Sequence, residues 1–210
     1  MKPTRPIIIA GASGHADVVF DCVMDMNLEV VGFIDPNIAA LNYKYNQPLY
    51  RDIREITKMN AYNYLIAIGD SSQRRRVYEA YCALSLTKDN FPFIIHPSAS
   101  ISATATIMPA AIILRNTIIE PGVVVSTGSL VNNASVISHG VILGEFSSIG
   151  PSVTIAGNAR VGSNASIGMG SNIIHNCKIG SGSIIGAGST VIEDIPDETK
   201  AWGVPAKPMT

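Results

Sequence analysis

Cysteine and net charge are both scarce in this 210-residue chain, and each scarcity excludes a class of protein. The three cysteines, Cys22, Cys82 and Cys177, are far apart and odd in number, which argues against a disulfide framework and a zinc site and is typical of buried thiols in a reducing cytosol. The formal net charge of −1 provides no field that would attract nucleic acid or an anionic membrane. The apolar run at residues 6–10 is short and leads into a glycine-rich turn, which fits neither a signal peptide nor a membrane span. We expect a cytoplasmic protein with no nucleic-acid and no membrane partner.

Charged and aromatic residues are rarest in the second half of the chain. Between residues 101 and 192, the charged side chains are Arg115, Glu120, Glu145, Arg160 and Lys178, and the one aromatic side chain is Phe146. A disordered low-complexity segment would carry more charge and fewer Ile and Val residues. We therefore expect this half to be folded, in a form that has no internal room for rings.

The second half of the chain carries a strict repeat of apolar residues. Apolar residues recur every six positions without exception, at Ile101, Ile107, Ile113, Ile119, Val125, Val131, Ile137, Leu143, Ile149, Ile155, Val161, Ile167, Ile173, Ile179, Ile185 and Val191. A period of six fits neither a helix nor a flat sheet and is typical of a parallel β-helix of hexapeptide repeats, in which each repeat is one short strand and one corner. The repeated side chain should point into the axis of the coil.

A second set of apolar residues stands one position before the repeated one. Its members are Ile112, Ile118, Val124, Leu130, Val136 and Ile142. These side chains should point outward, and monomeric surfaces rarely tolerate such a band. We expect a subunit interface to cover much of it.

The first ninety residues follow another rule, in which apolar strands alternate with helices. We expect strands at residues 7–10, 30–34 and 65–68 and helices at residues 17–26 and 73–84. This order predicts a small, Rossmann-like parallel sheet that binds ligands at the carboxyl ends of its strands. The predicted division is a domain of residues 1–94 and a β-helix domain of residues 95–210, whose proline-rich end caps the coil. The run Arg74-Arg75-Arg76 could reach a phosphate, but a solvated helix start is the favoured interpretation.

The turn Gly11-Ala12-Ser13-Gly14-His15 is a candidate phosphate site. Backbone N–H groups of Ser13, Gly14 and His15 at a helix N-terminus could hold a phosphate. The turn lacks the glycines of a dinucleotide fingerprint, which argues against a nicotinamide enzyme but leaves a nucleotide with one sugar possible. Asp35, at the end of a strand, could accept hydrogen bonds from a ribose or a base. The alternative reading is a tight turn and an ordinary strand-end carboxylate.

Two histidines share one phase of the hexapeptide repeat. His139 and His175 are thirty-six residues apart, which is six repeats, so they should project from the same kind of corner. Nothing between them supplies a carboxylate or thiolate at the matching height, and we predict no metal site. A single imidazole acting as general base is the sharper hypothesis for His139, because an unperturbed ring with a pKa of about 6.5 is mostly neutral at cellular pH.

Several segments together resemble the hexapeptide acyltransferases. They are Ile95-His96-Pro97-Ser98-Ala99, Ser138-His139-Gly140-Val141-Ile142-Leu143-Gly144, Ala156-Gly157-Asn158 and Gly203-Val204-Pro205-Ala206-Lys207. Three further segments are similar to bacterial sugar O- and N-acetyltransferases of the sialic acid and amino-sugar nucleotide type: Gly11-Ala12-Ser13-Gly14-His15, Phe33-Ile34-Asp35 and Ala67-Ile68-Gly69-Asp70. The resemblance covers almost the whole chain.

This resemblance implies a left-handed β-helix that forms a homotrimer, with acetyl-CoA lying along the helix between neighbouring subunits. It also implies that the N-terminal unit binds the nucleotide of an amino sugar. The residues expected at that substrate site are Gly11, Ser13, Gly14, His15, Asp35, Gly69 and Asp70.

The same resemblance gives the site residues of the β-helix their roles. His139 would take a proton from the sugar amine, the backbone N–H of Gly157 would face the thioester end of acetyl-CoA, and Lys207 would meet a CoA phosphate or be a solvated tail residue. One departure is that Gly140 stands where many relatives carry an acidic residue that orients the ring. Ser138, Asn133, Glu120 or a backbone carbonyl are the candidates to replace it.

The function expected from this resemblance is transfer of acetyl from acetyl-CoA to the amine of a UDP-, TDP- or GDP-linked 4-amino-4,6-dideoxy sugar, for polysaccharide biosynthesis. Two alternatives stay open. One is an O-acetyltransferase that acts on sialic acid or a related sugar, and the other is a noncatalytic trimeric scaffold, which Gly140 makes conceivable.

Overall fold

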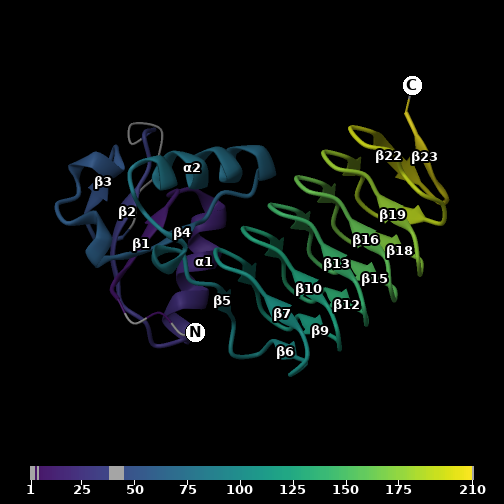
Figure 1. Ribbon diagram of the computed structural model, residues 1–210, viewed down its shortest axis with the longest axis horizontal. Coiled ribbons are helices and arrows are strands. Elements are labelled where there is room, and N and C mark those ends of the chain that lie inside the picture. The colour runs from purple at the N-terminus through teal and green to yellow at the C-terminus, as the bar shows by residue number, and fades with distance from the viewer. Residues whose placement is uncertain (1–2, 4, 38–44, 210) are drawn as a thin grey trace.

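The computed structural model describes residues 3, 5–37 and 45–209. The chain builds an N-terminal α/β unit and, beside it, a long left-handed parallel β-helix whose far end carries the C-terminus (Figure 1). The predicted fold class is therefore confirmed. The exact division at residues 94 and 95 stays a prediction.

A four-stranded parallel sheet in the order β3-β2-β1-β4 forms the N-terminal unit. Its elements are β1 Ile7–Ala10, α1 Gly14–Asp25, β2 Val30–Ile34, β3 Leu49–Tyr50, β4 Asn63–Ile66 and α2 Ser71–Ala83. Successive side chains of a strand point to opposite faces of the sheet. Accordingly Ile7 and Ile9 join the core under α1, whereas Ile8 and Ala10 join the core that includes Tyr81 of α2.

Two strands of this unit have the expected bounds, whereas both helices and the third strand lie near theirs with shifted ends. The strands at 7–10 and 30–34 are as predicted, but the third strand lies at Asn63–Ile66 because Tyr64 and Leu65 pair with β1. The second helix begins at Ser71, since the carboxylate of Asp70 caps it by accepting a hydrogen bond from the backbone N–H of Gln73. The two-residue strand β3 carries too little pattern to be foreseen.

From β5 to β21, every strand pairs with a strand one turn of eighteen residues away, which gives the β-helix three flat faces. Face I consists of β7 Thr106–Ile107, β10 Val124–Val125, β13 Ile142–Leu143, β16 Arg160–Val161 and β19 Lys178–Ile179. Face II consists of β5 Ile94–Ile95, β8 Ile112–Ile113, β11 Leu130–Val131, β14 Ser148–Ile149, β17 Ser166–Ile167, β20 Ile184–Ile185, β22 Lys200–Gly203 and β23 Ala206–Pro208. Face III consists of β6 Ser100–Ile101, β9 Ile118–Ile119, β12 Val136–Ile137, β15 Thr154–Ile155, β18 Asn172–Ile173 and β21 Thr190–Val191.

The repeated apolar residues fill the axis of this prism. All of them are buried except Ile101 and Ile107, which are half-buried because β6 and β7 are the edge strands of their faces. Phe146 lies outside the prism at a corner, where its ring contacts Tyr78 of α2 at a centroid distance of 5.4 Å. The hairpin of β22 and β23 continues face II beyond β20.

Part of the expected outward apolar band is covered within the chain itself. Ile112 and Leu130 on face II are each 2% exposed because they pack into the core beneath α1. These two residues are therefore not part of an exposed band, and the subunit interface expected over much of the band stays a prediction for the other four. Ile118, Val124, Val136 and Ile142, the rest of the band, lie on faces I and III and retain exposed surface.

A buried arginine joins α2 to the β-helix. Arg74 is 1% exposed, and its guanidinium donates hydrogen bonds to the backbone carbonyls of Gly128, Phe146 and Ser147 and to the Ser148 hydroxyl. It also donates to the carbonyls of Ile68 and Gly69. Burial lowers the pKa of Arg74 to about 10, which still leaves it cationic near neutral pH. The expectation of a solvated helix start is therefore wrong for this residue.

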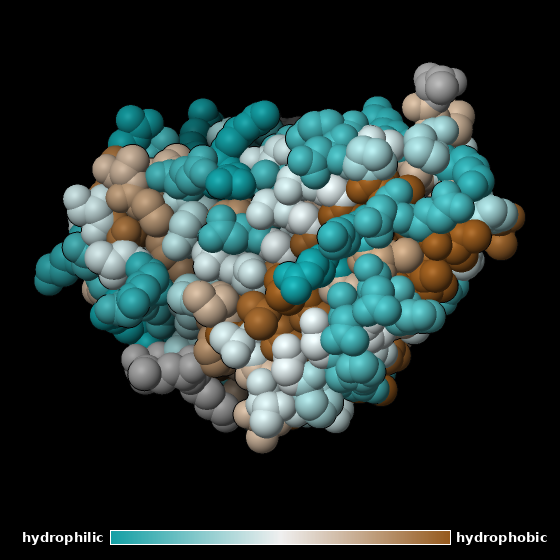
Figure 2. All heavy atoms as spheres, turned by 45° about the vertical axis from the view of Figure 1, so that its right-hand side comes forward, coloured by the Kyte–Doolittle hydropathy of each residue, from teal (hydrophilic) through white to brown (hydrophobic). Residues whose placement is uncertain are grey.

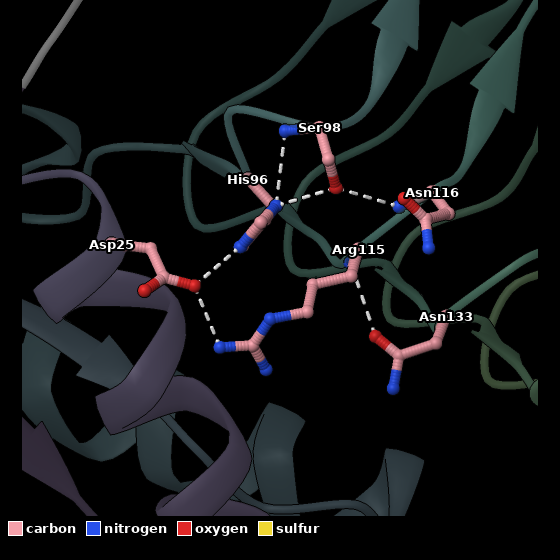
Figure 3. Close-up of polar contacts among 6 residues, drawn as sticks. All are labelled: Asp25, His96, Ser98, Arg115, Asn116 and Asn133. Carbon is pink, nitrogen blue, oxygen red and sulfur yellow. Dashed lines mark hydrogen bonds and ion pairs between the residues drawn. The ribbon is translucent and has the colours of Figure 1, made fainter.

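A second polar contact ties the end of α1 to the first coil (Figure 3). One carboxylate oxygen of Asp25 accepts hydrogen bonds from His96 Nε2 at 2.8 Å and from the Arg115 guanidinium at 2.7 Å. The His96 Nδ1 accepts from the backbone N–H of Ser98, which leaves its proton on Nε2. Hydrogen bonding from His96, and next from Arg115, lowers the pKa of Asp25.

Within the described ranges, none of the helices has both the length and the apolar character needed to cross a bilayer.

Candidate functional site

A cavity of about 630 Å³ opens at the carboxyl edge of the N-terminal sheet. The loops after β1, β2 and β4 and one side of α2 line it. Among the residues expected at a substrate site, Gly11, Ser13, Asp35, Gly69 and Asp70 line this cavity, whereas Gly14 and His15 are not part of its wall. The carboxyl edge is where a parallel sheet of this kind binds ligands.

The loop after β1 has to begin with glycine. Gly11 has a φ of +107°, and a Cβ there would come within 2.8 Å of the carbonyl oxygen of Ala67. The next residue, Ala12, donates its backbone N–H to one carboxylate oxygen of Asp35 at 3.0 Å, and Asn37 donates its own to the other at 2.9 Å. Asp35 therefore fixes two loops of the cavity while its carboxylate stays partly exposed.

The helix that starts at this loop has no side-chain cap. Ser13 occupies the N-cap position of α1, yet its hydroxyl makes no capping hydrogen bond. The first backbone N–H groups of a helix lack partners within the helix and carry the positive end of its dipole. This start of α1 can therefore accept an anionic group beside the cavity.

His15 is held uncharged in the first turn of α1. Burial, and next the positive charge of Arg74, lower the pKa of His15 to about 4. Its Nε2 atom is buried without a hydrogen-bond partner in the described part of the chain. The imidazole is therefore a mostly buried, neutral group that is close enough to Arg74 to feel its charge.

His139 lies at the corner between faces III and I, on the turn that joins β12 to β13. One coil along the same corner stands Gly157, and the next coil brings His175. A Cβ on Gly157 would lie 2.5 Å from Cε1 and 2.6 Å from Nε2 of His139. The imidazole therefore rests directly on the Gly157 backbone, and only glycine leaves room for it.

The turn that carries His139 explains why glycine follows it. Gly140 has a φ of +68°, in the left-handed region that favours glycine, and a Cβ there would overlap the side-chain oxygen of Asn158. The Glu120 carboxylate accepts a hydrogen bond at 2.9 Å from the backbone N–H of His139, not from its ring. Asn133 is engaged with the backbone of Arg115 instead. Within the described residues no hydrogen bond from Ser138, Asn133 or Glu120 to the ring is found, so these candidates do not orient it.

Lys207 stands at the far end of the same corner. Its Nζ lies 3.7 Å from a carboxylate oxygen of Glu193, which follows β21 in the coil beyond His175, and both side chains are exposed. Such a surface pair contributes little to stability. The ammonium group therefore remains accessible to a ligand that runs along the corner.

Within the described ranges, no group of three or more His, Cys, Asp or Glu side chains is placed to hold a metal ion.

Two important residues of these sites escaped sequence reasoning. Arg74 binds mainly backbone carbonyls, which leave no side-chain signal in a sequence. Tyr81 lines the cavity, and its spacing from Gln73 and Val77 on one side of α2 is the signal that could have found it.

Family models match two parts of the chain. Residues 6–81 match the PglD N-terminal domain, and residues 158–193 match the bacterial transferase hexapeptide model of six repeats. The first match covers the cavity-bearing unit, and the second lies in the coils that follow Gly157.

Solved structures match nearly the full length. PerB from Caulobacter crescentus, in complex with CoA and GDP-perosamine, has a TM-score of 0.89 and 25% identity, with 99% of each chain covered. The acetyltransferase domain of PglB from Neisseria gonorrhoeae FA1090, in complex with acetyl coenzyme A, has a TM-score of 0.89 and 28% identity, covering 99% of this chain and 100% of that one. WeeI from Acinetobacter baumannii AYE, at 20% identity and a TM-score of 0.56, covers 98% of this chain and 100% of its own and shares the fold alone.

Proposed function

We propose that this chain is one of the hexapeptide-repeat acetyltransferases of the nucleotide-amino-sugar type. In this proposal it moves acetyl from acetyl-CoA to the amine of a nucleotide-linked 4-amino-4,6-dideoxy sugar. The observation that carries this proposal is the contact between the exposed imidazole of His139 and the bare backbone of Gly157. The cavity in the N-terminal unit supplies a place for the nucleotide. The PerB structure with CoA and GDP-perosamine supports the choice of substrates.

His139 is the proposed general base. When the sugar nitrogen attacks the thioester carbonyl, an N–C bond forms, the C–S bond breaks and CoA leaves as its thiol. The imidazole takes the proton that the amine loses and can return one to the departing sulfur. Because the ring stands on Gly157, a reacting group that contacts the ring also lies beside this stretch of backbone.

Gly157 is the proposed contact for the thioester end of acetyl-CoA. Its carbonyl accepts a hydrogen bond from the backbone N–H of Asn176, whereas its own N–H has no acceptor in the described ranges. A free backbone N–H can stabilise negative charge that develops on the carbonyl oxygen during attack. Further along the corner Lys207 would meet a phosphate of CoA, three coils from His139, or roughly 14 Å at the usual strand spacing.

The nucleotide is proposed to bind with its phosphates at the start of α1, against the loop of Gly11 and Ser13, and with its ribose or base near Asp35. The uncapped N–H groups of α1 suit a diphosphate. Gly69 and Asp70 would close the opposite side of the cavity. Gly14 and His15 would contribute backbone groups only, because neither contributes to the cavity wall.

A homotrimer is proposed because, within one copy of the chain, the nucleotide cavity and His139 lie on opposite sides of the β-helix. The N-terminal unit packs on face II, through Ile112, Leu130 and Arg74, whereas His139 stands on the corner between the other two faces. That corner is opposite face II in a three-sided prism, so the cavity of the same copy lies across the prism from it. A neighbouring copy would bring its own cavity to this corner.

Apolar surface beside the catalytic corner supports the same assembly. Figure 2 shows hydrophobic side chains between rows of polar ones along the β-helix. Ile118, on face III, is 43% exposed, and Val136 on that face and Val124 and Ile142 on face I are half-buried. Contact with another copy would remove these side chains from water.

The reaction is proposed to take place in the cytoplasm, in the assembly of surface polysaccharide or glycan. It is tested by offering the purified protein acetyl-CoA with UDP-, TDP- and GDP-linked 4-amino sugars and with free sialic acid, and by following release of CoA thiol. We expect turnover with one nucleotide amino sugar and none with sialic acid. Turnover with sialic acid alone would favour the O-acetyltransferase, and no turnover with any acceptor would favour the noncatalytic scaffold.

A further inference from the structure

The inner wall of the cavity carries a hydroxyl group that the fold does not use. Tyr81 is only 7% exposed, yet it lines the cavity together with Gln73, Arg76 and Val77 from the same helix. Helical side chains tilt toward the helix N-terminus, which brings the Tyr81 ring toward the carboxyl edge of the sheet. Among the described residues, its hydroxyl has no hydrogen-bond partner.

The neighbouring Tyr64 differs from Tyr81 because its hydroxyl is hydrogen-bonded within the protein. Tyr64 packs edge-on against Tyr81 with ring centroids 5.7 Å apart, and its hydroxyl donates to the carbonyl oxygen of Met59 at 3.0 Å. Tyr64 is buried and is not part of the cavity wall. Of this pair, only Tyr81 lines the cavity.

A tyrosine hydroxyl in a cavity wall that has no hydrogen bond to the described residues is a candidate for contact with a ligand. Burial, and next the neighbouring Tyr64, raise the pKa of Tyr81 above its ordinary value. The phenol therefore stays neutral at cellular pH and can both donate and accept a hydrogen bond.

The shape and chemistry of the cavity around Tyr81 suit a flat, mostly apolar ring with a polar edge. Ile34, Ile68 and Val77 provide apolar walls, and Asp35 stands at the end of β2. The uncapped start of α1, next to Ser13, lies at the other end of the same space. A nucleotide with its phosphates at α1 would place its base between these walls.

We propose that the Tyr81 hydroxyl reads the hydrogen-bonding edge of the nucleobase and thereby selects which nucleotide sugar the protein accepts. This inference rests on the proposed function for its ligand class, and it assigns Tyr81 a specificity role, not a part in acetyl transfer. A site built to bond a particular edge rejects a base that leaves its buried hydroxyl unpaired. The selection then occurs on binding, before the amine reaches His139.

The test is the affinity of the full-length protein for UDP, TDP and GDP, each titrated alone by calorimetry, in the wild type and in Tyr81→Phe. The variant keeps the ring and removes only the oxygen. We expect binding of the preferred nucleotide to weaken about five- to tenfold and binding of the others to change less than twofold. Tyr64→Phe is the matched control: it also removes one phenolic oxygen from this core and should leave the three affinities in their original ratio.

The outcomes separate this inference from the proposed function. Unchanged affinities in Tyr81→Phe, or equal weakening for all three nucleotides, would overturn the base-reading role even if the wild type acetylates a nucleotide amino sugar. Selective weakening would support that role even if no acetylation were found, in which case the proposed function fails instead. Absence of nucleotide binding by the wild type would overturn the base-reading role, whereas turnover with the nucleotide amino sugars would still decide the proposed function.

Discussion

The imidazole of His139 rests on the backbone of Gly157, one coil further along the β-helix. The relationship comes from the eighteen-residue coil, which stacks residues 139 and 157 at one corner. Because the ring has no hydrogen-bond partner among the groups expected to orient it, packing against glycine is what defines its position. An acidic residue at position 140, where this chain has glycine, is therefore not required to hold the ring in place.

Gly157→Ala should inactivate the protein without unfolding it. The added methyl group would occupy the place of the imidazole, and a solvent-exposed histidine can swing away at small cost to stability. We expect turnover to fall about a hundredfold, in line with loss of a general base, while thermal unfolding stays near the wild-type temperature. His175→Ala, at the same corner one coil on, is the control and should retain turnover. An active Gly157→Ala protein would contradict the assigned ring position.

Arg74→Met should loosen the attachment of α2 to the β-helix. The substitution leaves the carbonyls of Gly128, Phe146 and Ser147 buried without donors, and we expect a loss of about 3 kcal/mol in the free energy of unfolding. Urea denaturation measures this loss. Arg76→Met is the matched control, because Arg76 is exposed on the same helix and should change stability by less than about 1 kcal/mol. Equal effects of the two substitutions would contradict the bridging role of Arg74.

The pH dependence of stability should carry the signature of a buried neutral histidine. His15 has a pKa of about 4 in the folded chain against about 6.5 when unfolded, so the unfolded state binds the extra proton between these values. Stability is therefore complete above pH 6.5 and falls as the pH drops toward 4, by up to about 3 kcal/mol. His15→Gln should flatten this part of the curve measured by urea denaturation, whereas exposed His175→Gln should not.

The apolar surface on faces I and III should be needed for assembly. Val124→Asp combined with Ile142→Asp places charges beside the catalytic corner, and we expect the mass in solution to fall to that of one chain. Asn172→Asp, a polar and exposed outward position on face III, should leave the mass unchanged. Light scattering after size-exclusion chromatography gives the answer. An unchanged mass of the double variant would contradict the proposed interface.

A site shared between copies also predicts complementation. Gly11→Val should distort the loop that lines the cavity, because its Cβ would collide with the carbonyl of Ala67 at a positive φ, while leaving His139 intact. Mixed trimers of Gly11→Val and His139→Ala chains should then regain activity that neither variant shows alone. Failure to regain activity in mixtures shown to exchange subunits would place both halves of the site in one copy.

The sequence predicts the β-helix well because each inward position depends only on its own burial. Ile137 and Ile155 are both apolar because each is buried in the axis of the coil, and the same requirement recurs every six residues. The site depends on contacts between neighbouring coils that cannot be seen in a sequence. Position 157 requires glycine because the His139 ring occupies the space of a Cβ, and position 140 requires glycine because the Asn158 side chain does the same there. Ile112 and Leu130 look like surface positions until the N-terminal unit covers them.

Turnover of the variant His139→Ala tests the central claim most directly, measured with acetyl-CoA and the nucleotide amino sugar that the wild type prefers. We predict a fall of at least about a hundredfold in kcat, with unchanged affinity for the free nucleotide, because the variant removes the base and leaves the cavity intact. A variant that turns over at the wild-type rate would contradict acetyl transfer by this corner of the β-helix.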